Sequence, residues 1–351
     1  MEKKQLRKIL CNLPQSLIKG GIILNTKKFD IKKFLVDNAI IFILLLMVCY
    51  VGITQPNFLS KNNFSNVSIN TAIRFIIALG VSGCLITKGT DLSAGRIVGL
   101  GACIVATLVQ KADYSDKFFP KLGDVPLIVA LLIAVAFCCI FGLINGLVIS
   151  FFKVPPFIAT LGMQTIVYGI CLVYTGASPI GGFRSEFTSL VSGKLFGIPY
   201  LFYFALIAGV FMWFLYNKTR HGKYMYAIGG NEVAAEVSGI NVNFTKILIY
   251  TLAAGLYAIG GFLLTAKAGG ATVNAGYGYE LEAIAACTIG GVSTNGGVGK
   301  VSGILVGVLV FELLKVSMQF LGVDTSYQYI VQGIVIVVAV ALDLRKYLAK
   351  K

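Results

Sequence analysis

Long apolar runs separated by short polar breaks dominate this chain. Most of the runs are long enough to cross the hydrocarbon core of a bilayer, about 30 Å thick, as an α-helix. They lie at residues 39–55, 69–87, 96–110, 125–151, 157–174, 199–216, 245–266, 282–292, 301–321 and 327–343. The pattern predicts an all-α membrane protein, a polytopic bundle of about 10 transmembrane helices. The run at 282–292 is too short for a full crossing and indicates a broken or re-entrant helix.

Lys and Arg are distributed unequally among the polar segments that separate the apolar runs. If the segment before the first run is placed inside, 21 of the 30 Lys and Arg fall on the inner face, 7 on the outer face and 2 within runs. Since positive charge gathers in cytoplasmic loops, both termini are expected in the cytoplasm. The chain then divides into a basic N-terminal segment at 1–38, a transmembrane domain at 39–343 and a basic tail at 344–351. Residues 3–14 are expected to lie along the inner leaflet or to form a disordered tail.

The composition supports a membrane protein and argues against nucleic-acid binding. Hydrophobic residues make up 57% of the chain and charged residues only 13%. The net charge of +15 is carried by loops and termini, which indicates membrane orientation rather than nucleic-acid binding. The 40 glycines include pairs four residues apart, such as Gly142 with Gly146 and Gly303 with Gly307, which let helices approach closely.

The sequence contains few residues or motifs that indicate catalysis or metal binding. The single histidine, His221, lies in a basic loop, and the cysteines show no metal-binding spacing. The Gly-rich stretch at 289–299 lacks the Lys-Ser or Lys-Thr of a phosphate-binding loop, so we expect a tight turn between helices there. We therefore expect no metal site, no cofactor and no ATP hydrolysis by this chain.

The most polar break between two runs is 87–96. Asp91 or Ser93 is expected to cap a helix that begins near Ala94. Unwound backbone inside a bundle also lines or gates polar pathways in transporters, and the two interpretations are compatible. The candidate pathway or gate residues are Thr90, Asp91, Ser93, Asn145 and Asn295.

Charged residues within the runs need compensation, because each costs about 2.5–3.5 kcal/mol at a helix centre. Glu312 and Lys315 are three residues apart on one helical face and can pair. Arg74 and Lys315 can instead extend toward the membrane surface. If the protein were a secondary transporter driven by an ion gradient, Asp91, Glu282 and Glu312 would be its candidate coupling carboxylates.

The basic loop at 217–246 is the most specific feature. Asn231 is a good helix N-cap, and Gly239 is a good helix terminator. Ala234 and Ala235 give the short helix between them a small profile, which suits docking in a groove of another protein. A plain surface helix is the alternative.

Three segments carry a resemblance to a known family. TKGTDLSAGR at 87–96, TRHGKYMYAIGGNEVAAEVSGINV at 219–242 and IGGVSTNGGVGKVSG at 289–303 resemble the membrane permease subunits of bacterial ABC sugar importers, in the ribose, xylose and galactoside branch. The similarity covers nearly the whole chain and is strongest to the permeases for galactose and methyl galactoside, notably around Asp91 and at 173–180.

The resemblance implies a function and a set of partners. The chain would be the permease subunit of an ATP-driven importer in the bacterial cytoplasmic membrane, moving galactose or methyl galactoside. It would work with an ABC ATPase subunit, an extracytoplasmic sugar-binding protein and a second permease copy. The loop helix would be the coupling helix that docks on the ATPase through Gly229, Gly230, Asn231, Ala234, Ala235 and Gly239. A transporter driven by an ion gradient is the alternative. A membrane enzyme is disfavoured, because the sequence shows no cluster of catalytic groups.

Overall fold

The computed structural model describes residues 39–348, so the basic segment predicted at 1–38 and residues 349–351 lie outside the described range. Almost all regular structure in that range is helical, which confirms the predicted all-α class. The helices are α3 (Ala39–Thr54), α4 (Lys61–Ile86), α5 (Ala94–Leu108), α6 (Leu127–Phe151), α7 (Pro156–Thr175), α8 (Ser185–Ser192), α9 (Tyr200–Lys218), α10 (Arg220–Gly230), α11 (Glu232–Val237), α12 (Val242–Ala268), α13 (Tyr279–Ile289), α14 (Val301–Phe320) and α15 (Thr325–Leu348). A small antiparallel hairpin joins β1 (Lys194–Leu195) to β2 (Ile198–Pro199).

Each predicted apolar run coincides with a helix. Seven helices of the described range are long and apolar enough to cross a membrane. They are α4, α6, α7, α9, α12, α14 and α15. The short run predicted as a broken or re-entrant segment is α13, which has only 11 residues. The count of about ten crossings stays a prediction.

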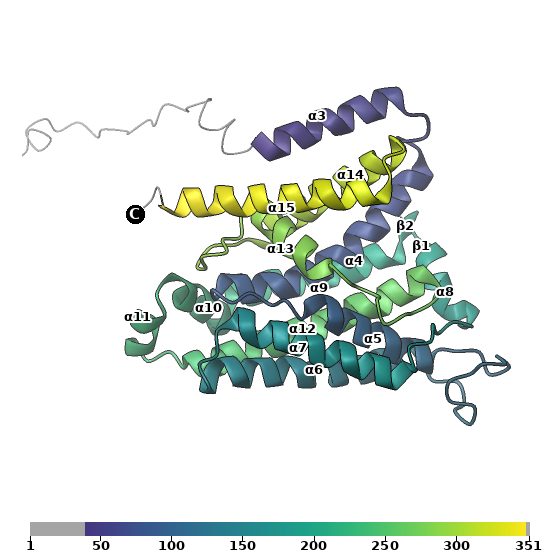
Figure 1. Cartoon of the computed structure of the whole chain (residues 1–351), viewed down its shortest axis with the longest axis horizontal. Helices are drawn as coiled ribbons and strands as arrows, with labels where there is room; N and C mark the ends of the chain where they lie inside the picture. The colour runs from purple at the N-terminus through teal and green to yellow at the C-terminus, as the bar shows by residue number, and fades with distance from the viewer. Residues whose placement is uncertain (1–38, 349–351) are drawn as a thin grey trace, which may run out of the picture. The chain divides into compact units, whose positions relative to one another are not determined.

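The loops that the charge pattern assigned to one face lie at one end of the bundle. In Figure 1, α10 and α11 lie at the left-hand end, together with the start of α3 and the end of α15. The loop after α13 and the end of α4 also lie there, because Gly229 of α10 packs against both Ile86 and Gly297. The opposite end, at the right, carries α8 and the β1–β2 hairpin. We call these the coupling end and the hairpin end.

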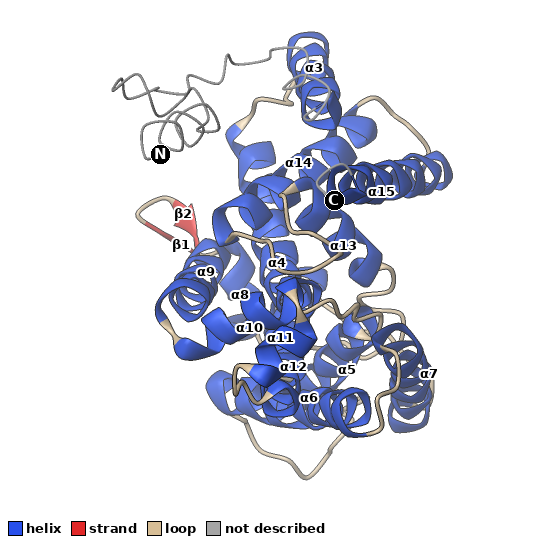
Figure 2. Ribbon diagram, turned by 90° about the vertical axis from the view of Figure 1, so that its left-hand side faces the viewer, coloured by secondary structure: helices blue, strands red, loops and turns tan. Residues whose placement is uncertain are grey.

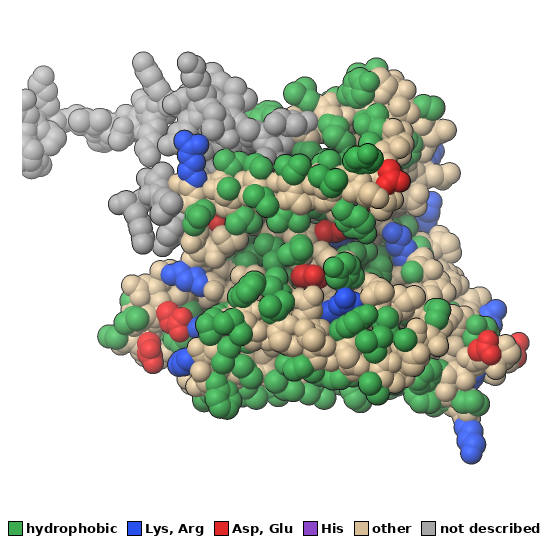
Figure 3. Space-filling model, in the orientation of Figure 1, with side chains coloured by type: hydrophobic (Ala, Val, Ile, Leu, Met, Phe, Trp, Pro, Cys, Tyr) green, Lys and Arg blue, Asp and Glu red, His purple; other side chains and the backbone are tan. Residues whose placement is uncertain are grey.

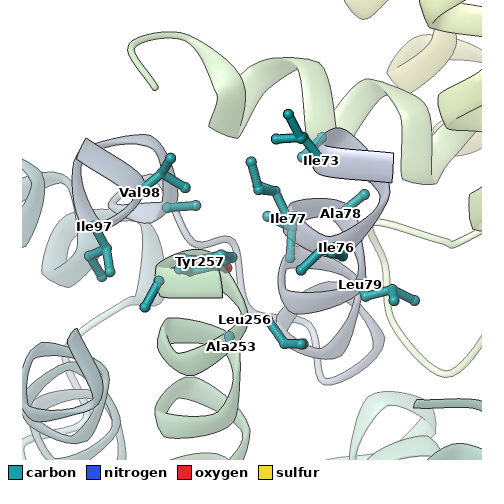
Figure 4. Packing of buried hydrophobic residues seen from close by; sticks show 14 of the residues in the cluster. Ile73, Ile76, Ile77, Ala78, Leu79, Ile97, Val98, Ala253, Leu256 and Tyr257 are labelled. Carbon is teal, nitrogen blue, oxygen red and sulfur yellow. The ribbon is translucent and has the colours of Figure 1, made fainter. Parts of the chain in front are cut away.

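The core is built around α4 and α12, the two most deeply buried of the long helices. Helix α12 packs against α6, α5 and α4 (Figure 2). Figure 4 shows the ring of Tyr257 lying between Ile77 of α4 and Ile97 and Val98 of α5. All four side chains are at most 1% exposed, so this contact fixes the spacing of the three helices.

Glycines make the close helix contacts that their spacing predicts. Gly142 and Gly146 of α6 lie against the backbone of α12, and Gly303 and Gly307 of α14 lie against α13. A β-carbon at any of these positions would collide with a backbone oxygen or carbon of the neighbouring helix. Such approach supplies van der Waals contact where lipid gives no hydrophobic drive for helix association.

Two short helices, α5 and α13, meet end to end inside the bundle. The loop at 87–93 leads to α5, and the loop at 269–278 leads to α13. Gly95 near the start of α5 lies directly against Gly276 and Glu280 at the start of α13. Since α5 spans about 22 Å and ends near the hairpin end, this junction lies deep in the bundle. Helices interrupted in this way occur at the binding sites of transporters.

The outer surface of the bundle is apolar. Figure 3 shows hydrophobic side chains over most of one face, with charged side chains mainly at the two ends. Exposed examples are Leu132 on α6, Phe157 on α7, Ile207 on α9 and Val337 on α15. Apolar surface on this scale marks contact with a membrane.

Candidate functional site

The segment before α5 forms a closed hydrogen-bonded network. The carboxylate of Asp91 accepts hydrogen bonds from the Ser93 hydroxyl at 2.6 Å and from the Tyr257 hydroxyl at 3.1 Å. The Asn145 amide of α6 donates to the Ser93 hydroxyl at 3.0 Å. All four residues are buried. The structure therefore joins three of the predicted pathway residues through polar groups that satisfy one another.

The cap predicted for α5 takes a different form. The helix begins at Ala94 as expected, but the Ser93 side chain makes no cap hydrogen bond. Asp91 accepts instead from the backbone N–H of Ser93, one residue before the helix. The short turn from Asp91 to Ser93 explains this, because it keeps the carboxylate on its own loop rather than over the helix end.

The other two predicted pathway residues lie elsewhere. The carbonyl of Thr90 accepts from the hydroxyl of Thr160, which ties the loop to α7. Asn295 lies in the loop between α13 and α14, at the coupling end, and is not part of the Asp91 network. That loop is held to α15, because Asp343 accepts from the backbone and hydroxyl of Thr294 at 2.9 Å.

The basic loop is mostly helical and confirms its predicted end signals. The Asn231 side chain accepts from the Ala234 N–H at 3.0 Å and so caps α11. Helix α11 ends at Val237, and Gly239 follows with φ of 84°, a conformation that suits glycine. The sequence did not predict α10, which the Thr219 side chain caps. Partial burial lowers the pKa of His221 in this helix.

Two of the predicted docking residues face the bundle. Ala235 is 4% exposed and packs with Ile228 and Val242. Gly229 is buried against Ile86 and the loop at Gly297. Small residues are needed where α10 and α11 approach the bundle, and the docking role of Ala235 and Gly229 stays a prediction.

The remaining docking candidates are exposed, and two valines join them. Gly230, Asn231, Ala234 and Gly239 face outward. Val233 is 71% exposed and Val237 85%, although sequence reasoning passed over both. Two valines four residues apart on a short polar helix were the available signal, because such spacing places both on one face.

Helices α10 and α11 are tied to the ends of several long helices. Gly229 packs on the end of α4 and on the loop that leads to α14. The Tyr226 hydroxyl donates to the Gly299 carbonyl of the same loop at 2.8 Å. Lys246 of α12 pairs with Glu232 of α11 at 2.7 Å. A force on α11 would therefore reach α12 through Lys246, and it would reach α4 and the loop before α14 through α10.

Four charges form one ion network among α4, α13 and α14. Arg74 lies 2.9 Å from Glu282 and 2.8 Å from Glu312, and Lys315 lies 2.7 Å from Glu282. The expected pair of Glu312 with Lys315 does not form. Arg74 and Lys315 also do not extend to the surface, since each side chain is only 15% exposed. Helix packing brings Glu282 between the two basic groups, which gives both a closer partner.

A polar stripe leads from the hairpin end toward this network. Asn62, Asn66 and Asn70 are spaced four residues apart on α4 and line a cavity of about 750 Å³. Asn70 donates to Glu312 at 2.6 Å. The regular spacing is present in the sequence, but Asn62 and Asn66 precede the apolar run predicted at 69–87.

The described residues offer no candidate for a metal centre. Within 39–348, no group of three or more His, Cys, Asp or Glu side chains is placed to hold an ion.

Comparison with known proteins gives consistent similarity along the chain. Residues 63–340 match the family described as branched-chain amino acid transport system / permease component. The galactose/methyl galactoside import permease protein of Escherichia coli is 46% identical over 335 residues, covering 93% of this chain and 99% of that protein. The protein of the same name from Haemophilus influenzae is 45% identical, covering 93% and 98%. The ribose import permease protein of Bacillus subtilis is 39% identical, covering 86% and 91%. No solved structure matches significantly.

Proposed function

The chain belongs to the branched-chain amino acid transport system / permease component family, and we propose that it is the membrane-spanning permease subunit of an ATP-driven importer for galactose or methyl galactoside. The observation that carries this proposal is the sequence identity of 45–46% to two galactose/methyl galactoside import permeases over 93% of the chain. The ribose import permease of Bacillus subtilis, at 39% identity, is less similar than these two proteins, which favours a hexose.

The bundle supplies the parts that such a subunit needs. Apolar helices hold it in the cytoplasmic membrane, and the capped helix α11 stands at one end with its outer face exposed. A separate ABC ATPase subunit would dock on that face, with Val233, Ala234 and Val237 in its groove. A sugar-binding protein would deliver solute at the hairpin end, and a second copy of the chain would complete the pathway.

Transport would follow from a shift between two packings of the helices. ATP binding to the partner subunit would favour one packing and hydrolysis the other. The contacts of α10 and α11 with α4, α12 and α14 carry that shift into the bundle. The ion network of Arg74, Glu282, Glu312 and Lys315 lies on two of the helices that would move.

Uptake by proteoliposomes tests the proposal. The chain is reconstituted with its ATPase subunit and a galactose-binding protein, and entry of labelled galactose is followed with and without ATP. We expect uptake only when ATP and both partners are present. Uptake driven by a proton or sodium gradient with no ATPase subunit would replace this proposal with an ion-gradient transporter.

Substituting the outer face of α11 tests the coupling role. Ala234→Arg places a bulky charge on the exposed face, and we expect ATP-dependent uptake to be lost while the protein remains folded. Glu236→Ala, also on an exposed position of α11 but without added bulk, is the control. Undiminished uptake by Ala234→Arg would remove this helix from the docking surface.

A further inference from the structure

A second cavity, of about 700 Å³, lies on the other side of the α12 end. Its rim is formed by the loop at 179–181 and by Tyr114, near the hairpin end. Its wall is the segment 268–279, which includes Asn274, Tyr277 and Tyr279. Pockets of roughly 300–1,000 Å³ are typical of small-molecule sites.

The cavity reaches the buried junction of α5 and α13. Gly276 in its wall lies against Gly95, where the two short helices meet. Tyr279 also lines a small cavity with Arg74 and Glu282, so the wall continues toward the ion network. Figure 3 shows a few acidic and basic side chains at mid-height, away from the two ends of the face. Binding sites in transporters lie at this depth, beside interrupted helices.

An arginine organises the side chains of the wall. Arg96 lies with its guanidinium carbon 4.8 Å from the centre of the Tyr277 ring and 4.1 Å from that of Tyr168. It donates to the Val273 carbonyl at 3.1 Å and to the Asn274 side-chain oxygen at 3.3 Å. These contacts fix the orientation of Tyr277 and Asn274, although 64% of Tyr277 is still exposed.

This combination of groups suits a neutral sugar. A pyranose ring presents C–H groups on its faces, which pack on aromatic rings, and hydroxyls at its edge, which bond to amides and guanidinium groups. A lipid chain would offer no partner to the amide N–H groups of Asn274 in the cavity wall.

We propose that this cavity is the site at which the permease itself holds the sugar during passage, with Tyr277 packing on the pyranose and Asn274 bonding its hydroxyls. Arg96 is a positioning residue that holds both. The proposal rests on the proposed function and adds to it a site within this chain, in addition to the selectivity of the binding protein.

Coupled measurement of uptake and ATP hydrolysis tests the site. The full complex is reconstituted with galactose-loaded binding protein, and galactose imported per ATP hydrolysed is determined. For Tyr277→Ala we expect this ratio to fall about two- to tenfold, the range expected for one lost aromatic contact. Asn274→Ala is expected to lower it similarly. Tyr277→Phe keeps the ring and is expected to preserve the ratio.

A matched control and two contrary results complete the test. Tyr50→Ala removes a tyrosine that is 60% exposed on α3, and its ratio should equal that of the unaltered protein. The site is refuted if Tyr277→Ala and Asn274→Ala both import as the unaltered protein does. It is also refuted if both variants lose uptake, ATP hydrolysis and thermal stability together, because that result assigns them a structural role. Failure of the unaltered complex to import any hexose would instead overturn the proposed function.

Discussion

The guanidinium of Arg74 lies 2.8 Å from the carboxylate of Glu312, which joins α4 to α14 in the interior of the bundle. Glu312 is only 2% exposed, and its second oxygen accepts from the Asn70 amide. A carboxylate held in this way depends on its partners, because removal of one charge leaves the other buried and uncompensated.

Arg74→Ala should destabilise the protein strongly. It removes the ion-pair partner of Glu312 and one of the two ion-pair partners of Glu282, and breaking a buried pair costs about 3–5 kcal/mol. The measurement is thermal unfolding in detergent. Arg220→Ala, which removes an exposed arginine at the coupling end, is the control and should leave the midpoint unchanged. An equal midpoint for the two variants would contradict the role of the network.

Gly229→Ala should loosen α10 from the bundle. The added β-carbon would overlap the Ile86 carbonyl oxygen and the Gly297 backbone, so α10 must move. Overpacking of this kind typically costs about 1–3 kcal/mol. Gly230→Ala is a matched control one residue away, because no atom lies within 4 Å of the place that its β-carbon would occupy. Thermal unfolding of the two variants should separate them, and equal midpoints would contradict the close packing.

Asp91→Ala should lower the stability of the folded protein. The change leaves the buried hydroxyls of Ser93 and Tyr257 without their acceptor, and each unpaired group costs about 1–3 kcal/mol. The free energy of unfolding, measured by denaturant titration, should fall accordingly. Asp113→Ala removes an exposed carboxylate and serves as the control. A stable Asp91→Ala protein that fails to transport would instead favour the predicted pathway role of Asp91.

Val233→Asp combined with Val237→Asp should prevent assembly with the ATPase subunit. Both valines are largely exposed on α11, so the bundle should fold normally while the apolar docking face is lost. Co-purification of the ATPase subunit with the permease measures the effect. Leu195→Asp, at the hairpin end, should co-purify as the unaltered protein does. Retained assembly of the double variant would place the docking surface elsewhere.

The sequence by itself determined the class of the fold and the positions of its apolar helices. Apolar runs, the Asn231 cap and the Gly239 terminator are signals between near neighbours in the chain, and all of them appear in the structure as predicted. The spacing of Gly142 and Gly146 likewise indicated close contact, because i to i+4 positions share one face of a helix.

Only the tertiary structure decided which helix each residue meets. The sequence allowed Glu312 to pair with Lys315, but the packing of α4 and α13 against α14 gave both residues other partners. The small size of Ala235 suited a docking face or a packed face, and the approach of α11 to the bundle made it a packed one. The cavity beside Tyr277 exists because the loop at 179–181 meets the segment 268–279, where Ile180 pairs with Ala271, a contact between segments far apart in the chain.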